Sequence, residues 1–193
     1  MSRLIAFFIF ILTLPIYPAL FLLIKFTSPG PFIFTQIRSG KNKKHFTMYK
    51  IRTMVKNAEE LKTKYEKLNE TDGPAFKIRN DPRYTTFGKV LAHTGLDELP
   101  QLINIIKGEM AFVGPRPLPI SEAQNVPEKY SERFSVLPGL TSPWIIQGSH
   151  KLSFKTWMEL DCQYVKNKNI KDDFIIILKT IIIILRSILS PLL

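Results

Sequence analysis

Two adjacent acidic residues, Asp97 and Glu98, are the strongest candidates for chemistry in this sequence. A pair of carboxylates can supply a nucleophile and a ligand for a hard divalent cation such as magnesium. Apolar residues follow at helical spacing, and Pro100 is tolerated only where backbone N–H groups are still free. We therefore expect a helix to begin just before Pro100, with both acids in its first turn. The helix dipole also favours acids at that position, so a purely structural role stays open.

Arg116 is the best candidate for binding a phosphate. It lies between two prolines in Gly114-Pro-Arg-Pro117, after a predicted short buried strand at 111–113. Restricting the backbone on both sides lowers the entropy cost of holding a guanidinium against an anion.

Lys50 and Arg52 are weaker candidates for the same task. Residues 31–38 and 46–52 alternate between apolar and polar positions and flank a turn cluster, which predicts a β-hairpin with Lys50 and Arg52 on one face. Basic side chains also decorate exposed hairpins without binding anything. Further along, we expect a solvated helix over 55–68 and a short helix over 85–93.

Composition limits the partners that these residues can serve. The chain has 193 residues, 27 Lys and Arg against 16 Asp and Glu, a net charge of +11 and a 45% hydrophobic content. So much apolar sequence excludes a disordered basic tail, and the single cysteine, Cys162, excludes a disulfide framework. The charge favours polyanions: nucleic acid, anionic lipid or phosphorylated substrates. No recognition motif for RNA or DNA is present, so no nucleic-acid partner is expected.

The apolar residues are concentrated at the two ends of the chain. Residues 4–24 contain no charge and as one helix would extend roughly 31 Å, about the thickness of the bilayer core. Pro15 and Pro18 predict a kink of the helix near 14–17. Three interpretations of the segment therefore stay open: a hairpin that enters and leaves one leaflet, a spanning helix, and a signal peptide. Basic residues that follow favour a cytoplasmic main body. The helix near 173–189 carries Lys179 and Arg186 on one face, which suits the head-group interface or a core position with snorkelling charges.

The motifs, in their order along the chain, resemble the bacterial sugar transferase family, the monotopic polyprenyl-phosphate phosphoglycosyl transferases. The matching segments are Ser28-Pro-Gly-Pro31, Gln36-Ile-Arg38, Tyr49-Lys-Ile-Arg-Thr-Met54, Asp81-Pro-Arg83, Leu96-Asp-Glu-Leu-Pro-Gln-Leu102, Lys107-Gly-Glu-Met110, Val113-Gly-Pro-Arg-Pro117, Pro138-Gly-Leu-Thr141 and Glu159-Leu-Asp161. Each segment is weakly specific alone, but together they cover essentially the whole chain.

The resemblance implies an enzyme that moves a sugar-1-phosphate from a UDP-sugar to undecaprenyl phosphate and releases UMP, with Mg²⁺ required. Such an enzyme is an undecaprenyl-phosphate sugar phosphotransferase, and it would catalyse the first membrane step of surface polysaccharide or glycoprotein glycan synthesis. Asp97 matches the covalent nucleophile, and Glu98 assists at the metal site, where both acids are expected ligands. Arg116, helped by Lys50 and Arg52, is expected to bind substrate phosphate.

The resemblance also implies an architecture. Residues 1–27 would form a re-entrant membrane helix broken at Pro15 and Pro18, and residues 28–193 a catalytic domain that includes the interfacial helix near 173–189. The expected fold class is α+β, a small monotopic protein with a short β-hairpin or sheet and amphipathic helices at the membrane surface. It would lie on the cytoplasmic face of the bacterial inner membrane against anionic lipid, and exposed helical faces make a homodimer plausible.

Several positions depart from the family pattern. The family usually has arginine at one or both of the positions of Ala92 and His93, and commonly serine at Gly95. The segment 142–150 also differs, and His150 is a candidate replacement for a basic contact. These departures near the acidic pair keep open the alternative of a catalytically inactive membrane scaffold with the same fold.

Overall fold

The computed structural model describes residues 1–148 and 152–189, so His150 lies outside the described residues. The helices are α1 (Ser2–Thr13), α2 (Ile16–Thr27), α3 (Leu61–Lys64), α4 (Thr86–Thr94), α5 (Gln101–Lys107), α6 (Ile120–Gln124), α7 (Pro143–Ile146), α8 (Phe154–Asn167) and α9 (Ile170–Leu189). The 3₁₀ segments are η1 (Lys41–Lys43), η2 (Glu66–Leu68), η3 (Leu96–Glu98) and η4 (Glu128–Phe134). The strands are β1 (Ile33–Ser39), β2 (His45–Ile51), β3 (Ala111–Val113), β4 (Leu118–Pro119) and β5 (Gly139–Thr141).

The predicted break in the N-terminal apolar segment is confirmed. Helices α1 and α2 meet at an angle of 61°. Pro15 caps α2 and Pro18 lies in its first turn, where the backbone N–H groups have no helical partner and a proline does no harm. Within 1–148 and 152–189, no individual helix has both the length and the apolar character to cross a bilayer. The bent pair of α1 and α2 has that length and apolar character only when the two helices are taken together.

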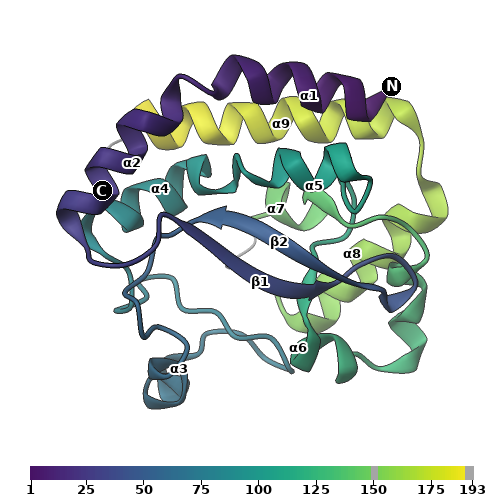
Figure 1. The fold of residues 1–193 in the computed structure, drawn as a ribbon. Helices are drawn as coiled ribbons and strands as arrows, with labels where there is room; N and C mark the ends of the chain where they lie inside the picture. Colours follow the sequence, from purple (N-terminus) through teal and green to yellow (C-terminus); the bar gives the residue numbers. More distant parts are fainter. Residues whose placement is uncertain (149–151, 190–193) are drawn as a thin grey trace.

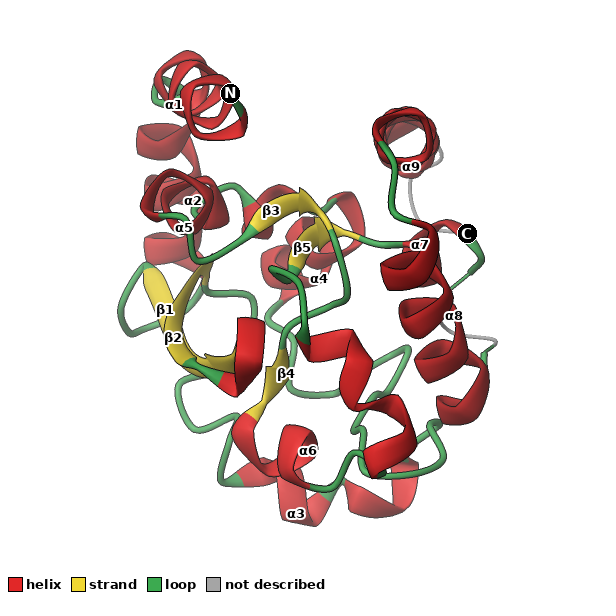
Figure 2. Ribbon diagram, turned by 90° about the vertical axis from the view of Figure 1, so that its right-hand side faces the viewer, coloured by secondary structure: helices red, strands yellow, loops and turns green. Residues whose placement is uncertain are grey.

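Helices α1 and α9 run along the same face of the molecule (Figure 1), and the turned view of Figure 2 shows them as two separate ridges. Both ridges expose large apolar side chains, such as Leu4, Phe8 and Leu12 on α1 and Phe174, Ile181 and Leu185 on α9. On its inner side α1 packs on α5, where Ala6 joins a core with Leu102 and Ile105.

Two small sheets lie below these helices. β1 and β2 form the expected antiparallel hairpin with Ile33 opposite Ile51, and β4 extends it in the order β2-β1-β4. β3 and β5 pair in parallel, with Ala111 opposite Gly139. Tyr164, on α8, donates to the Val113 carbonyl at 3.1 Å and so fixes the end of β3. The protein is thus a mixed fold of helices and small sheets, as expected.

Other predicted elements are confirmed or revised. The helix expected over 85–93 is α4, whose N-cap Thr85 accepts from the Gly88 N–H at 3.0 Å. The C-terminal helix is also present, as α9. The helix expected over 55–68 is wrong, because only the short α3 and η2 form there. Most side chains of this segment are exposed, so there is little apolar burial to hold a longer helix in place.

Candidate active site

The acidic pair lies on η3, a 3₁₀ turn between α4 and α5. Gly95, at φ +70°, ends α4 in the left-handed conformation, and the Glu98 N–H then donates to the Gly95 carbonyl at 3.1 Å. Helix α5 begins only at Gln101, after Pro100. The expected position of Asp97 and Glu98 in the first turn of that helix is therefore wrong: they precede it on a separate turn.

Strand β2 brings Lys50 to this turn. Lys50 Nζ lies 2.6 Å from Glu98 Oε1 and 3.5 Å from Asp97 Oδ2. Asn104 of α5 fixes the strand: its Nδ2 donates to the Thr47 carbonyl at 2.7 Å, and its Oδ1 accepts from the Tyr49 N–H at 3.2 Å. These hydrogen bonds hold the backbone of β2 directly before Lys50.

Burial and charge act differently on the two acids. Burial raises the pKa of Asp97 to about 6, although the charge of Lys50 opposes the shift. Burial also raises the pKa of Glu98, but Lys50 and Arg116 together outweigh it, so the pKa of Glu98 lies below its ordinary value. At neutral pH both acids are ionised, and Asp97, which is only 5% exposed, is a poorly hydrated carboxylate. Such a carboxylate suits nucleophilic attack.

Arg116 reaches the same site from the loop after β3. Its Nη1 lies 3.7 Å from Glu98 Oε1, and its side chain is 30% exposed. Its backbone carbonyl accepts from Arg133 Nη2 at 2.8 Å, and the same nitrogen lies 2.8 Å from Asp161 Oδ2. Arg133 and Asp161 are almost fully buried. Sequence reasoning did not give these two residues a role in the site, and only their proximity in the fold shows that they support Arg116.

Arg38 is a further cation at this site. It lies on β1 and donates from Nη1 to the Pro117 carbonyl at 3.1 Å. Burial, and then the charge of Arg116, lowers the pKa of Arg38 to about 10, while Glu122 and Glu98 act in the opposite direction. The sequence places Arg38 on a strand of the hairpin and within the family motif, but not beside Pro117, because the pairing of β1 with β4 links distant parts of the chain.

Arg52 is not brought to the acidic pair. Its Nη1 donates to Ser28 Oγ at 2.9 Å and also to the Pro29 carbonyl, and its Nη2 donates to the Ser28 carbonyl at 2.8 Å. The side chain therefore ties the loop after α2 to the end of the hairpin. These contacts give no support to the expected phosphate-binding role of Arg52, whereas Lys50 and Arg116 lie at the site.

The positions that depart from the family pattern lie toward α9. The His93 carbonyl accepts from Ser187 Oγ at 2.8 Å, and His93 Nδ1 lies 2.7 Å from the Lys89 carbonyl. A Cβ added to Gly95 would lie 3.9 Å from Ile184 Cδ1. Ala92 lies on α4 between these contacts and is half-buried.

The acidic pair can hold a metal ion only if water or substrate supplies the remaining ligands. In residues 1–148 and 152–189, no cluster of three or more His, Cys, Asp and Glu side chains is arranged to bind one. Magnesium, however, often takes one or two carboxylates and fills its other positions with water and substrate phosphate oxygens. The hard oxygen donors of Asp97 and Glu98 fit that mode.

Comparison with known proteins agrees with these motifs. A family model described as bacterial sugar transferase matches residues 1–187. The galactosyl transferase CpsE of Streptococcus agalactiae is 39% identical over 157 residues, which cover 81% of this chain and 35% of CpsE. The undecaprenyl-phosphate galactose phosphotransferase of Salmonella typhimurium is 37% identical over 81% of this chain and 34% of its own length. The exopolysaccharide production protein ExoY of Rhizobium meliloti is 37% identical over 86% of this chain and 76% of its own length. The chain thus spans about a third of the first two relatives and three quarters of ExoY.

Proposed function

The chain belongs to the bacterial sugar transferase family, and on that premise we propose that it transfers a sugar-1-phosphate from a UDP-sugar to undecaprenyl phosphate and releases UMP. Relatives named undecaprenyl-phosphate galactose phosphotransferase and UDP-galactose-lipid carrier transferase support both substrates. The observation that carries the proposal is the buried carboxylate of Asp97 beside Glu98, with Lys50 and Arg116 close enough to receive phosphate oxygens.

The transfer proceeds in two displacements. An oxygen of Asp97 attacks the sugar-linked phosphorus, the bond from that phosphorus to the bridging oxygen breaks, and UMP leaves with the electron pair. A phosphate oxygen of the lipid then attacks the aspartyl phosphosugar, and Asp97 departs as a carboxylate. Lys50 and Arg116 stabilise the charge on the phosphoryl oxygens in both steps.

Glu98 has a different task. Its pKa is held low by Lys50 and Arg116, so it stays ionised and is suited to metal binding rather than to proton transfer. Mg²⁺ bound by Glu98, Asp97 and the diphosphate would neutralise the negative charge of the nucleotide. Before substrate binds, the charge of Lys50 offsets those of both carboxylates.

The apolar ridges of α1 and α9 support a membrane surface as the location of this chemistry. The exposed apolar side chains of α1, α2 and α9 and the 61° bend between α1 and α2 support a re-entrant hairpin and an interfacial helix on the cytoplasmic face of the inner membrane. A cysteine introduced at Ser2 tests this topology, because it should react with an impermeant thiol reagent only from the cytoplasmic side. Reaction from the periplasm would establish a spanning segment.

Turnover of a panel of UDP-sugars with undecaprenyl phosphate and Mg²⁺, followed as UMP release, tests the reaction. One sugar should give turnover, and Asp97→Asn should abolish it. No turnover across a broad panel would favour the inactive scaffold, and full activity of Asp97→Asn would refute the covalent mechanism.

A further inference from the structure

Trp144 carries two cations at its indole ring. Lys77 Nζ lies 4.3 Å from the ring centroid, and the Arg116 guanidinium carbon lies 5.7 Å from it. Trp157 stacks on Trp144 at a centroid separation of 4.5 Å and an interplanar angle of 19°. Because Trp157 occupies one face of the indole, Lys77 must lie over the other. The buried tryptophan pair is therefore a rigid base for a lysine that comes from a distant part of the chain.

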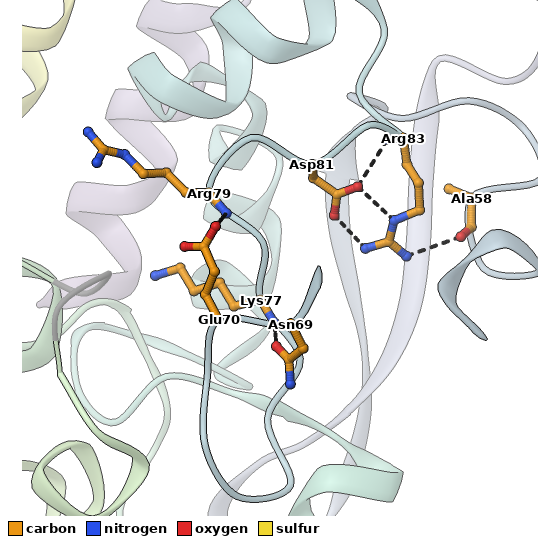
Figure 3. Close-up of polar contacts among 7 residues, drawn as sticks. All are labelled: Ala58, Asn69, Glu70, Lys77, Arg79, Asp81 and Arg83. Atoms are coloured by element: carbon orange, nitrogen blue, oxygen red, sulfur yellow. Dashed lines mark hydrogen bonds and ion pairs between the residues drawn. The ribbon is translucent and has the colours of Figure 1, made fainter. Parts of the chain in front are cut away.

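Hydrogen bonds hold the backbone of the segment that carries Lys77. The Lys77 N–H donates to Asn69 Oδ1 at 2.8 Å, and the Arg79 N–H donates to Glu70 Oε1 at 3.1 Å. Beyond them, Asp81 and Arg83 form a buried ion pair at 2.6 Å, and Figure 3 shows these contacts along the segment. The position of Lys77 is thus determined by the fold and not by chance contact of a surface side chain.

The positive charge of Arg116 acts on Lys77. Burial, followed by the positive charge of Arg116, lowers the pKa of Lys77 to about 7, and Glu70 compensates only in part. Two like charges at one buried ring can both contact the same anion, which suits a phosphate.

The order of the charged groups indicates which anion this is. Arg116 is the shared neighbour: its Nη1 lies 3.7 Å from Glu98 Oε1 of the acidic pair, and its guanidinium lies at the Trp144 ring together with Lys77. A diphosphate with its sugar-linked phosphorus at Asp97 therefore directs its second phosphate past Arg116 toward Lys77. That second phosphate becomes the phosphate of UMP when the bond breaks.

We propose that Lys77, held over Trp144 beside Arg116, binds the nucleotide-side phosphate of the UDP-sugar and stabilises the negative charge that UMP acquires as it leaves. This inference rests on the proposed function and adds a specific leaving-group contact to it. The electron pair of the broken phosphorus–oxygen bond stays on UMP, and Lys77 contributes a positive charge without giving up its proton.

Isothermal titration of the detergent-solubilised full chain with UMP and with uridine tests the assignment. Lys77→Met should weaken UMP binding about tenfold while leaving uridine binding unchanged, because a charge-assisted hydrogen bond to phosphate is lost and the nucleoside contacts remain. Lys77→Arg should restore most of the UMP affinity. Lys67→Met is the matched control, since Lys67 is an exposed lysine ten residues earlier in the same region and should bind both ligands like wild type.

The outcomes separate this inference from the proposed function. If wild type binds UMP and Lys77→Met binds it equally well, the Lys77 assignment is overturned and the proposed function stands. An equal loss of UMP and uridine binding also overturns it, because Lys77 would then be supporting the fold or the nucleoside pocket. If wild type does not bind UMP, the proposed function itself fails.

Discussion

Lys50 Nζ lies 2.6 Å from Glu98 Oε1, a contact between strand β2 and the turn η3 that places one cation against two adjacent carboxylates. Without that cation, Asp97 and Glu98 would repel each other and any incoming phosphate. The contact explains how the buried charge of Asp97 and the half-buried charge of Glu98 coexist beside the expected position of an anionic substrate.

Replacing Lys50 should reduce catalysis more than it reduces stability. We expect Lys50→Met to lower kcat for UMP release by about ten- to a hundredfold, because a charge-assisted hydrogen bond to the acidic pair and a cation for the phosphoryl oxygens are both lost. Lys50→Arg should recover part of the rate. Lys44→Met, at an exposed position of the same hairpin, is the control. An unchanged rate in Lys50→Met would contradict the assignment of Lys50 to the site.

The buried pair of Asp161 and Arg133 should show separable effects on stability and on binding. Asp161→Ala leaves Arg133 buried without its partner and should destabilise the protein by about 3–5 kcal/mol in chemical unfolding. The double replacement Asp161→Leu with Arg133→Met removes both charges and should recover much of that stability. It also removes the N–H that holds the Arg116 carbonyl, so KM for the UDP-sugar should still rise. A stable double variant with wild-type KM would show that the pair does not position Arg116.

Magnesium binding should depend on the nucleotide. Two carboxylates beside Lys50 make a weak site on their own, whereas the diphosphate adds oxygen ligands. We expect titration calorimetry to show Mg²⁺ affinity increasing by about tenfold or more when UDP is present. EDTA should stop UMP release, and added Mg²⁺ should restore it. Glu98→Gln should weaken the coupling, and tight Mg²⁺ binding without nucleotide would contradict this account.

The lowered pKa of Lys77 predicts a pH dependence of stability. Burial and Arg116 lower this pKa from 10.5 to about 7, so between these values the unfolded chain binds one more proton than the folded chain, and folding stability rises with pH. Lys77→Met removes this contribution. The melting temperature of Lys77→Met should therefore exceed that of wild type most clearly near pH 7, and the difference should shrink toward pH 10. A difference that does not change with pH would mean that Lys77 is not held at such a position.

Local patterns in the sequence identified the hairpin, α4, α9 and the proline break, because each depends on neighbouring residues. The residues that complete the site depend on contacts across the chain. Asp161 is 28 residues from Arg133, and Lys77 reaches Trp144 from a segment without regular structure. Arg52 shows another limit. Alternation predicted that it shares a face with Lys50, but Arg52 lies just beyond β2 and contacts Ser28 and Pro29, because the loop after α2 packs against the end of the hairpin.

The shared core between α1 and α5 has a practical consequence for anyone handling this protein. Ala6 is fully buried against the same cluster that holds Leu102, Ile105 and Met110, and α5 begins three residues after Glu98. A shortened version lacking residues 1–27 would present that cluster to water directly behind the acidic pair. Extraction with a mild detergent that preserves the hairpin is therefore the route to a well-ordered preparation, and truncation for solubility is expected to give aggregated material.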